Sequence, residues 1–232
     1  MTDNSCVMII AAHPDDEVIG CGGAAAIHAR NGDIVHVLIV AEGATSRCDG
    51  RESPAHAAAL VELKNAARTA AGVLGLQNPM FLGLPDNRLD SIALLEVTQK
   101  IERVIAEVAP NIVYTHHGGD LNIDHRIVHQ AVITACRPQP DHSVQKVLTF
   151  ETVSSTEWAT SSTDFNFRPN VFVDINSVLD AKCRALKAYQ MEMRSFPHAR
   201  SLENIDALAK FRGASVGVAA AESFMLVREI IA

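Results

Sequence analysis

The chain has 232 residues, of which 48% are hydrophobic and 20% are charged, and its formal net charge is −7. This hydrophobic content allows a sizeable core and excludes a wholly disordered chain. The acidic balance, with an isoelectric point near 5.8, lacks the basic excess with which nucleic-acid-binding proteins neutralise phosphates. We therefore expect no nucleic-acid partner.

The sequence also argues against membrane insertion and disulfide bonding. No uninterrupted apolar run approaches the roughly 20 residues that span a bilayer, and the N-terminal residues lack the basic segment of a signal peptide. The cysteines are scattered and form no CxxC pair, which excludes a thiolate zinc site and a disulfide framework. We expect a cytoplasmic protein with no membrane span. The cysteines are Cys6, Cys21, Cys48, Cys136 and Cys183.

Apolar strand-like runs alternate with helical segments along the first part of the chain. Strands rich in Val and Ile that alternate with helices predict βαβ units, and their nearly continuous apolar character predicts a mostly parallel sheet buried on both faces. In chain order we expect a strand over residues 6–12, a helix over 18–31, a strand over 33–41, a helix over 55–74, a strand over 80–84, a helix over 91–108, a strand over 111–115 and a helix over 125–135.

The last part of the chain predicts two more strands, over residues 146–153 and 170–175, and three helices, over 178–193, 202–211 and 219–231. Two segments read as long loops. Residues 42–54 are polar and follow the second strand, and residues 154–170 form a probable loop or insertion. No linker divides the chain, so we expect an α/β protein with helices on both faces of the sheet.

The first strand is followed by the run AHPDDE at residues 12–17, which opens the first helix. Ligands bind at the carboxyl ends of strands in open α/β sheets, and an imidazole beside carboxylates suits a divalent metal. Acidic residues are also common in the first turn of a helix for reasons of capping and dipole. That structural explanation accounts for Asp15, Asp16 and Glu17 but gives no reason for His13.

A second polar run, THHGGDLNIDHR at residues 115–126, follows another strand and leads into a helix. It brings further His and Asp residues to the same edge of the sheet. His125 and His129 have the spacing of the HExxH zinc proteases, but Arg126 stands where that motif needs Glu, so we exclude that class. We interpret His129 as a packing residue.

Several nucleotide and hydrolase motifs are absent. The glycines at residues 20–23 lack the GxGxxG pattern and lie inside the predicted helix, so they indicate close packing rather than a dinucleotide site. There is no P-loop and no GxSxG nucleophile elbow. A third polar stretch, residues 192–201, contains Arg194 and His198; it is either a ligand-binding segment or a solvated loop with a helix cap at Ser201.

The HPDDE run at residues 13–17 resembles the AHPDDE signature of the LmbE-like (PIG-L) family of zinc-dependent N-deacetylases. The Asp124-His125 pair later in the chain strengthens this resemblance, which covers nearly the whole sequence. The resemblance implies a single Rossmann-like domain over residues 1–232 and hydrolysis of an acetamide.

By the same resemblance, His13, Asp16 and His125 are the zinc ligands, with one zinc ion per chain or another divalent ion in its place, and Asp15 is the general base. Three protein ligands leave open positions for water and for the acetamide carbonyl. Asp124 either orients the His125 imidazole or caps the helix that follows.

The sequence departs from the family at Asn122, where many members have a histidine that acts on the oxyanion or the leaving group. An amide can donate a hydrogen bond but cannot release a proton near neutral pH. We therefore expect Asn122 to be an oxyanion donor close to the metal. His116, His117 and His198 are candidates for the missing proton donor, with His198 favoured.

The resulting expectation is a homo-oligomeric enzyme that removes acetate from an N-acetylated, N-acetylglucosamine-like amino sugar. Arg194 and His198 are expected to face the metal and complete the site. The alternatives are an amidase acting on a thiol-sugar conjugate or another acylated metabolite, and a metal-containing sugar- or nucleotide-binding module without catalysis.

Overall fold

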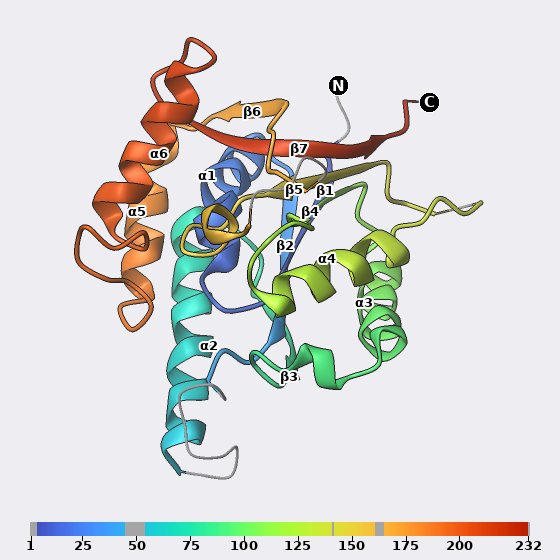
Figure 1. Cartoon of the computed structure of the whole chain (residues 1–232). Coiled ribbons are helices and arrows are strands. Elements are labelled where there is room, and N and C mark those ends of the chain that lie inside the picture. Colours follow the sequence, from blue (N-terminus) through green and yellow to red (C-terminus); the bar gives the residue numbers. More distant parts are fainter. Residues whose placement is uncertain (1–3, 45–53, 141, 161–164, 232) are drawn as a thin grey trace.

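The computed structural model describes residues 4–44, 54–140, 142–160 and 165–231. These residues form a seven-stranded sheet in the order β3-β2-β1-β4-β5-β7-β6, with helices on both faces (Figure 1). The predicted α/β architecture is confirmed. The strands are β1 (Cys6–Ala11), β2 (Ile34–Ala41), β3 (Met80–Leu84), β4 (Ile112–His116), β5 (Lys146–Phe150), β6 (Val171–Asp174) and β7 (Ala221–Glu229).

The helices follow the expected alternation with the strands through most of the chain. None of those in the described residues is both long and apolar enough to cross a bilayer. They are α1 (Asp16–Arg30), α2 (Pro54–Leu74), α3 (Leu94–Val108), α4 (Ile123–Ala135), α5 (Leu179–Ala188) and α6 (Leu202–Ala214), with short 3-10 turns η2 (Leu89–Ser91), η3 (Thr156–Trp158) and η4 (Asn176–Val178).

The predicted helix over residues 219–231 is wrong, because this segment forms strand β7. β7 lies antiparallel between β5 and β6, whereas β1 to β5 are mutually parallel. Its Ala, Glu, Met and Leu residues are good helix formers, but pairing with a strand on each side overrides that local preference. The expected loop over 42–54 has residues 45–53 outside the described part of the chain. The expected loop over 154–170 contains η3, and its residues 161–164 also lie outside that part.

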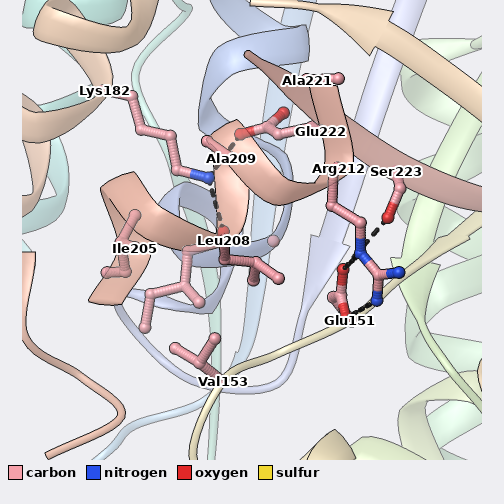
Figure 2. A pocket seen from close by; sticks show the side chains of 12 residues that line it. Glu151, Val153, Lys182, Ile205, Leu208, Ala209, Arg212, Ala221, Glu222 and Ser223 are labelled. Carbon is pink, nitrogen blue, oxygen red and sulfur yellow. Dashed lines mark hydrogen bonds and ion pairs between the residues drawn. The ribbon is translucent and has the colours of Figure 1, made fainter. Parts of the chain in front are cut away.

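Helix α1 packs unusually close to the sheet and is fixed by a buried ion pair. A Cβ at Gly20 would lie 2.2 Å from the Phe150 ring, so only glycine permits this approach. Lys182 Nζ donates to the carbonyl of Ile19 at 2.8 Å and lies 2.6 Å from Glu222 Oε1. The Glu222 carboxylate in turn accepts from two backbone amides of α1. Figure 2 shows this pair at the end of a small pocket between α1, α6 and β7.

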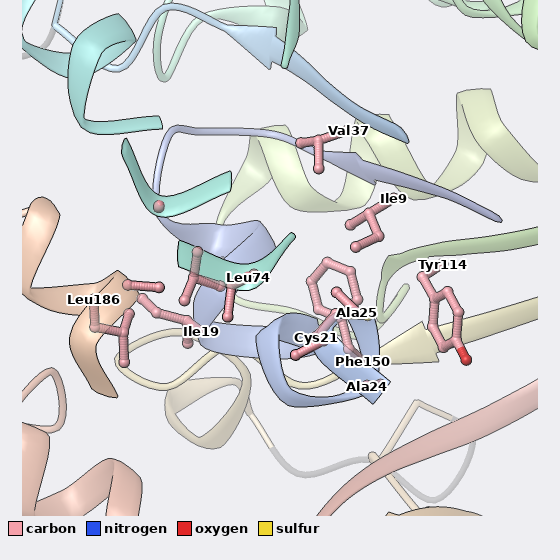
Figure 3. Close-up of a cluster of buried hydrophobic side chains, with 14 of the residues drawn as sticks. Ile9, Ile19, Cys21, Ala24, Ala25, Val37, Leu74, Tyr114, Phe150 and Leu186 are labelled. Carbon is pink, nitrogen blue, oxygen red and sulfur yellow. The ribbon is translucent and has the colours of Figure 1, made fainter. Parts of the chain in front are cut away.

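The core consists of two clusters, one on each face of the sheet. Alternate residues of β1 point to opposite faces, so Val7 and Ile9 belong to one cluster and Met8 and Ile10 to the other. The first cluster packs the sheet against α1 and α2 and extends to α5 (Figure 3). The second packs it against α3 and α4. The continuous apolar strands of the sequence are therefore buried on both sides, as expected.

The central pair β1 and β4 places the two polar runs side by side. These strands are parallel neighbours, with Ile10 opposite Thr115. They therefore end at the same edge, and the residues after each strand meet there. The first run enters α1 at Asp16 and the second enters α4 at Ile123. This edge holds the candidate site.

Candidate functional site

Three donor atoms from the two polar runs converge between α1 and α4. Asp16 Oδ2 lies 3.2 Å from His13 Nδ1 and 3.2 Å from His125 Nε2, and the two imidazole nitrogens are 3.3 Å apart. All three side chains are buried. Together they form a nearly equilateral triangle of two nitrogens and one carboxylate oxygen, which is a candidate metal site.

This triangle fits a zinc ion. Zinc bonds of about 2.0–2.1 Å at tetrahedral angles place neighbouring ligand atoms about 3.3 Å apart, which agrees with the separations above. A second observation points the same way. Asp15 Oδ1 and Asp16 Oδ1 are buried and have no hydrogen-bond partner among the described residues. Buried carboxylate oxygens are normally paired or bound to metal, so the site has coordinating capacity that the protein leaves unused.

Both imidazoles have a carboxylate at the ring nitrogen that faces away from the triangle. Asp124 Oδ2 lies 3.1 Å from His13 Nε2, and Asp120 Oδ1 lies 3.1 Å from His125 Nδ1. This arrangement is typical of metal-binding histidines, because the outer carboxylate fixes the tautomer and the ring orientation. Of the two expected roles of Asp124, orientation of His125 is therefore wrong, because Asp120 occupies that position, and the cap of the helix is Asn122 rather than Asp124.

The sequence does not predict that Asp124 contacts His13 and Asp120 contacts His125, because the loop after β3 determines these contacts. Asp124 also accepts from the backbone amides of Asn87, at 2.7 Å, and Leu89, at 3.0 Å. These contacts turn its carboxylate toward His13. Asp86 approaches the same imidazole, with Oδ1 3.2 Å from His13 Nε2. His13, Asp86 and Asp124 form a second group with metal-ligand spacing, but Asp124 already accepts two backbone hydrogen bonds there.

Asp15 lies directly beside the triangle in a strained conformation. Its φ is 110°, a region that residues with a side chain rarely adopt. Its backbone amide donates to Glu17 Oε2 at 3.0 Å, which holds the turn in place. Such strain is usually retained where a side chain must point in one direction. Here it separates the Asp15 carboxylate from that of its neighbour Asp16.

The two adjacent carboxyl groups have opposite electrostatic environments. Burial raises the pKa of Asp15 well above its usual range, and Arg200 only partly offsets this. Burial acts in the same sense on Asp16, but the neighbouring His125, His13 and His116 together outweigh it and hold the pKa of Asp16 well below its usual range. Groups whose pKa values are driven apart suit different roles, with Asp16 as a permanent anion and Asp15 as a group that can hold a proton.

Arg200 covers Asp15 from the segment before α6. One of its terminal nitrogens donates to Asp15 Oδ2 at 2.6 Å, and its Nε donates to Ser154 Oγ at 2.8 Å. The same terminal nitrogen lies 3.6 Å from Glu192 Oε2. The guanidinium therefore brings a permanent positive charge to the donor triangle. The sequence interpretation recognised the polar stretch 192–201 but did not single out Arg200.

Arg194 and His198 do not contact the triangle within the chain, contrary to expectation. Arg194 is exposed and donates to the carbonyls of Met191 and Met193. His198 is also exposed, and its Nδ1 accepts from the backbone amide of Arg200. The backbone amide of Arg194 donates to the carbonyl of Arg200, so the segment folds back on itself. Arg194 and His198 therefore face solvent, whereas Arg200 at the end of the segment faces the site.

Asn122 is the N-cap of α4. Its side-chain oxygen accepts from the Asp124 amide at 2.8 Å, and its Nδ2 donates to Asn87 Oδ1 at 3.1 Å. Both ends of the side-chain amide are therefore used within the protein. Through these contacts Asn122 fixes the position of Asp124 and of the loop after β3.

The two adjacent histidines after β4 have structural partners. The backbone amide of Ala12 donates to His116 Nε2 at 2.8 Å, and the His116 ring stacks on His125 with centroids 3.9 Å apart. Burial and the nearby His125 lower the pKa of His116 well below its usual value, so its imidazole is neutral. His117 Nε2 lies 2.8 Å from the carbonyl oxygen of Phe165. The contacts of His116 and of His117 therefore favour neither residue as the missing proton donor.

The chain matches a known family. The sequence profile described as PIG-L: GlcNAc-PI de-N-acetylase matches residues 8–136, which is more than half of the chain. The match includes both polar runs and therefore every residue of the donor triangle.

Individual relatives carry related names. The chain is 28% identical over 190 residues to an uncharacterized deacetylase, YaiS, of Escherichia coli, with 79% of this chain and 90% of the relative covered. It is 28% identical over 209 residues to a diacetylchitobiose deacetylase of Thermococcus kodakarensis, with 80% and 69% covered.

Solved structures share the fold. The N,N'-diacetylchitobiose deacetylase of Pyrococcus horikoshii superimposes with a TM-score of 0.78 at 20% identity, covering 97% of this chain and 85% of that one. The 4-carboxy-2-hydroxymuconate hydratase GalB of Pseudomonas putida gives 0.77 at 22% identity, with 98% of each chain covered. Because this fold is common to a deacetylase and a hydratase, the fold does not determine the reaction.

Proposed function

The chain belongs to the PIG-L family of deacetylases, and on this premise we propose that it hydrolyses the acetamide of an N-acetylated, N-acetylglucosamine-like amino sugar. The products are acetate and the free amine. The observation that carries this proposal is the triangle of His13, Asp16 and His125, with the carboxylate of Asp15 held beside it by a strained backbone. A module that only binds metal has no need of a second, separately poised carboxylate.

We propose that His13 Nδ1, Asp16 Oδ2 and His125 Nε2 hold the metal, and that the metal is zinc. When bound, zinc supplies Lewis acidity, which polarises the amide carbonyl and lowers the pKa of water. The residues behind the ligands support this assignment. Asp124 and Asp120 lie 3.1 Å from the outer ring nitrogens, the position from which a carboxylate favours the tautomer whose inner nitrogen carries a lone pair.

Asp15 is the proposed general base and then the general acid. Its carboxylate takes a proton from the attacking water and returns it to the nitrogen of the leaving amine. The raised pKa of this buried carboxyl supports the second step, because the group can hold a proton near neutral pH. The permanent charge of Arg200 lowers the pKa of Asp15 and so favours the carboxylate form that the first step needs.

Arg200 is the proposed partner for the negative charge that develops on the acetamide oxygen. The guanidinium can donate hydrogen bonds but cannot give up its proton, so it stabilises charge without joining the proton transfer. This proposal assigns to Arg200 the electrostatic part of what a histidine does at the position of Asn122 in many family members. Oxyanion donors of this kind contribute roughly 3 kcal/mol when well placed.

Acetate release from a panel of N-acetylated sugars tests the function. The zinc-loaded protein is expected to release acetate and expose one amine per acetate, and Asp15→Asn serves as the inactive control with the same fold. The panel includes N-acetylglucosamine glycosides, an acylated thiol-sugar conjugate and a simple N-acetyl amine, which separates the sugar deacetylase from a wider amidase. No acetate from any of them, with zinc in place, contradicts the proposal.

A further inference from the structure

A groove of about 530 Å³ lies next to the candidate site, between the end of β5 and α6. Its walls come from four segments that are distant in sequence, namely the residues after β5, η3, the turn before α6 and α6 itself. Two large aromatic side chains are exposed on it, Trp158 at 54% and Phe211 at 64%. The apolar part of the lining is Val153, Trp158, Pro197, Ala199, Ala207, Leu208 and Phe211.

The groove is joined to the catalytic residues through two short links. Ala199 lines the groove, and the next residue, Arg200, donates to Asp15 at 2.6 Å. On the opposite wall, Thr152 Oγ1 lies 3.3 Å from His116 Nδ1, and the His116 ring stacks on His125. The groove therefore lies one side-chain contact away from residues of the candidate site.

The chemistry of the lining favours an uncharged, flat and apolar group. Exposed Trp and Phe rings bind planar rings by stacking and by loss of water-accessible area. None of the described residues that line the groove is a lysine or an arginine, although His198 lies edge-on to Trp158 within it and Arg212 lies over the Phe211 ring beside it. The two carboxylates present, Glu151 and Glu157, disfavour an anion.

These carboxylates are also engaged within the protein. Glu151 forms two contacts with Arg212, at 2.8 and 2.6 Å. Glu157 accepts from the backbone amides of Ser154 and Ser155, at 2.6 and 3.2 Å. Glu151 and Glu157 therefore stabilise the wall of the groove and are not available to a cationic ligand. The aromatic rings remain as the exposed binding groups.

We propose that this groove binds the aglycone of the substrate, the group joined to the anomeric carbon of the amino sugar, and that this aglycone is uncharged and aromatic. The proposal rests on the proposed deacetylase function for its orientation, because the acetamide must lie at the donor triangle while the aglycone lies between Trp158 and Phe211. It assigns substrate selection to residues outside the PIG-L match at 8–136.

Binding can be measured without turnover, because Trp158 is the single tryptophan of the chain. Its emission therefore reports on the groove alone. We use zinc-loaded Asp15→Asn protein, so that the ligand stays intact, and titrate it with the phenyl and the methyl β-glycosides of N-acetylglucosamine. The phenyl glycoside is expected to change the emission and to bind about tenfold more tightly, the effect of roughly 1.4 kcal/mol from one stacked ring. A methyl glycoside that binds as tightly contradicts the groove.

Kinetics with matched variants locate the effect. In the otherwise unchanged protein we expect kcat/KM about tenfold higher for the phenyl glycoside, mostly through KM. Trp158→Ala and Phe211→Ala are expected to reduce this ratio to about one. Phe165→Ala is the control: Phe165 is 65% exposed, like Phe211, but lines a neighbouring groove instead. Loss of the preference in Phe165→Ala alone, or a preference for a carboxylate-bearing aglycone, overturns the proposal.

The two proposals fail in different ways. If every glycoside releases acetate at the same rate and none alters Trp158 emission, the groove assignment falls and the deacetylase function stands. If no glycoside releases acetate but the phenyl glycoside still alters the emission, the deacetylase function falls and the groove remains a binding site for aromatic rings.

Discussion

Helix α1 meets two buried groups of charges, and they are built in opposite ways. At its N-terminus, Asp15 and Asp16 face the two imidazoles of the donor triangle. One turn later, the Lys182–Glu222 pair binds the backbone of the same helix. Both groups are almost fully buried and both join segments distant in sequence.

The difference lies in how completely their polar atoms are used. Each charged atom of the Lys182–Glu222 pair has a partner, either the other charge or an α1 backbone group. At the N-terminus, Asp15 Oδ1 and Asp16 Oδ1 have no hydrogen-bond partner in the described residues, and the Asp15 backbone is strained. Satisfied buried charges hold a structure together, whereas unsatisfied ones are retained for a ligand. The contrast predicts that changes at the first group affect activity and changes at the second affect stability.

Removal of a metal ligand should give the largest effect. We expect His13→Ala, Asp16→Ala and His125→Ala each to reduce bound zinc from about one ion per chain to near zero. Acetate release should fall by roughly a thousandfold, since Lewis-acid stabilisation is worth several kcal/mol. Metal analysis of the purified variants checks this. Thermal unfolding of each variant is compared with that of the metal-free unchanged protein, because loss of an imidazole also leaves buried carboxylates without a partner. Full zinc retention by all three variants would falsify the site.

Breaking the Lys182–Glu222 pair should act on stability instead. Lys182→Ala leaves Glu222 buried without its counter-charge, which typically costs 3–5 kcal/mol of unfolding free energy. For a chain of this size that is a fall of about 10 °C in Tm. Zinc content and kcat of the folded fraction should stay close to those of the unchanged protein, as measured at a temperature well below the transition.

The double variant Lys182→Met with Glu222→Gln is the control for this experiment. It removes both charges and keeps the volume, so most of the lost stability should return. A Lys182→Ala protein that is fully stable but has lost its zinc would show that the pair belongs to the site and would remove the contrast.

Asp15→Asn should separate chemistry from metal binding within one pair of neighbours. The change keeps the shape and removes the base, so turnover is expected to fall by about a hundredfold or more. Zinc content is expected to stay the same, whereas Asp16→Asn should lose it. Because burial opposes ionisation of Asp15, the neutral variant should be at least as stable as the unchanged protein. If it lost its zinc, Asp15 would have to be counted among the ligands.

The outer carboxylates should give a smaller effect on the metal. We expect Asp120→Asn and Asp124→Asn each to weaken zinc affinity by roughly 10- to 100-fold, the usual result of disturbing a group that orients a ligand. Competition with a chelator measures it. Asp90→Asn is the matched control, since Asp90 is exposed. Equal zinc affinity in all three variants would mean that the imidazoles hold their orientation without these carboxylates.

The sequence predicted the central parallel strands of the sheet better than the antiparallel strand β7. Strands β1, β2 and β4 were recognisable because burial on both faces makes them uniformly apolar. β7 was not, since its residues suit a helix and only its neighbours β5 and β6 make it a strand. Long-range pairing of this kind leaves no local signal in one sequence.

The site divides in the same manner. The donor triangle follows from two local motifs at the ends of strands, and the pairing of β1 with β4 in a parallel sheet brings His13 and His125 together. Arg200 and the exchange of Asp120 for Asp124 depend on how loops fold back. The polar stretch 192–201 indicated that some charged residue contributes, but a loop that turns on itself has no periodicity from which to identify it.

The smallest effect is expected at Asn122, where two interpretations give different numbers. An oxyanion donor would cost about a hundredfold in turnover when removed and would leave stability unchanged. The N-cap contacts instead predict a loss of about 1 kcal/mol on Asn122→Ala, seen as a Tm lower by 2–4 °C. Turnover should fall by less than tenfold, through the displaced Asp124. Asn122→Asp keeps the oxygen that accepts from the Asp124 amide and loses only the donor to Asn87. This variant should therefore recover most of the lost stability if the side chain acts as a cap. A variant with unchanged Tm and a hundredfold lower kcat would instead make Asn122 a direct participant in the reaction.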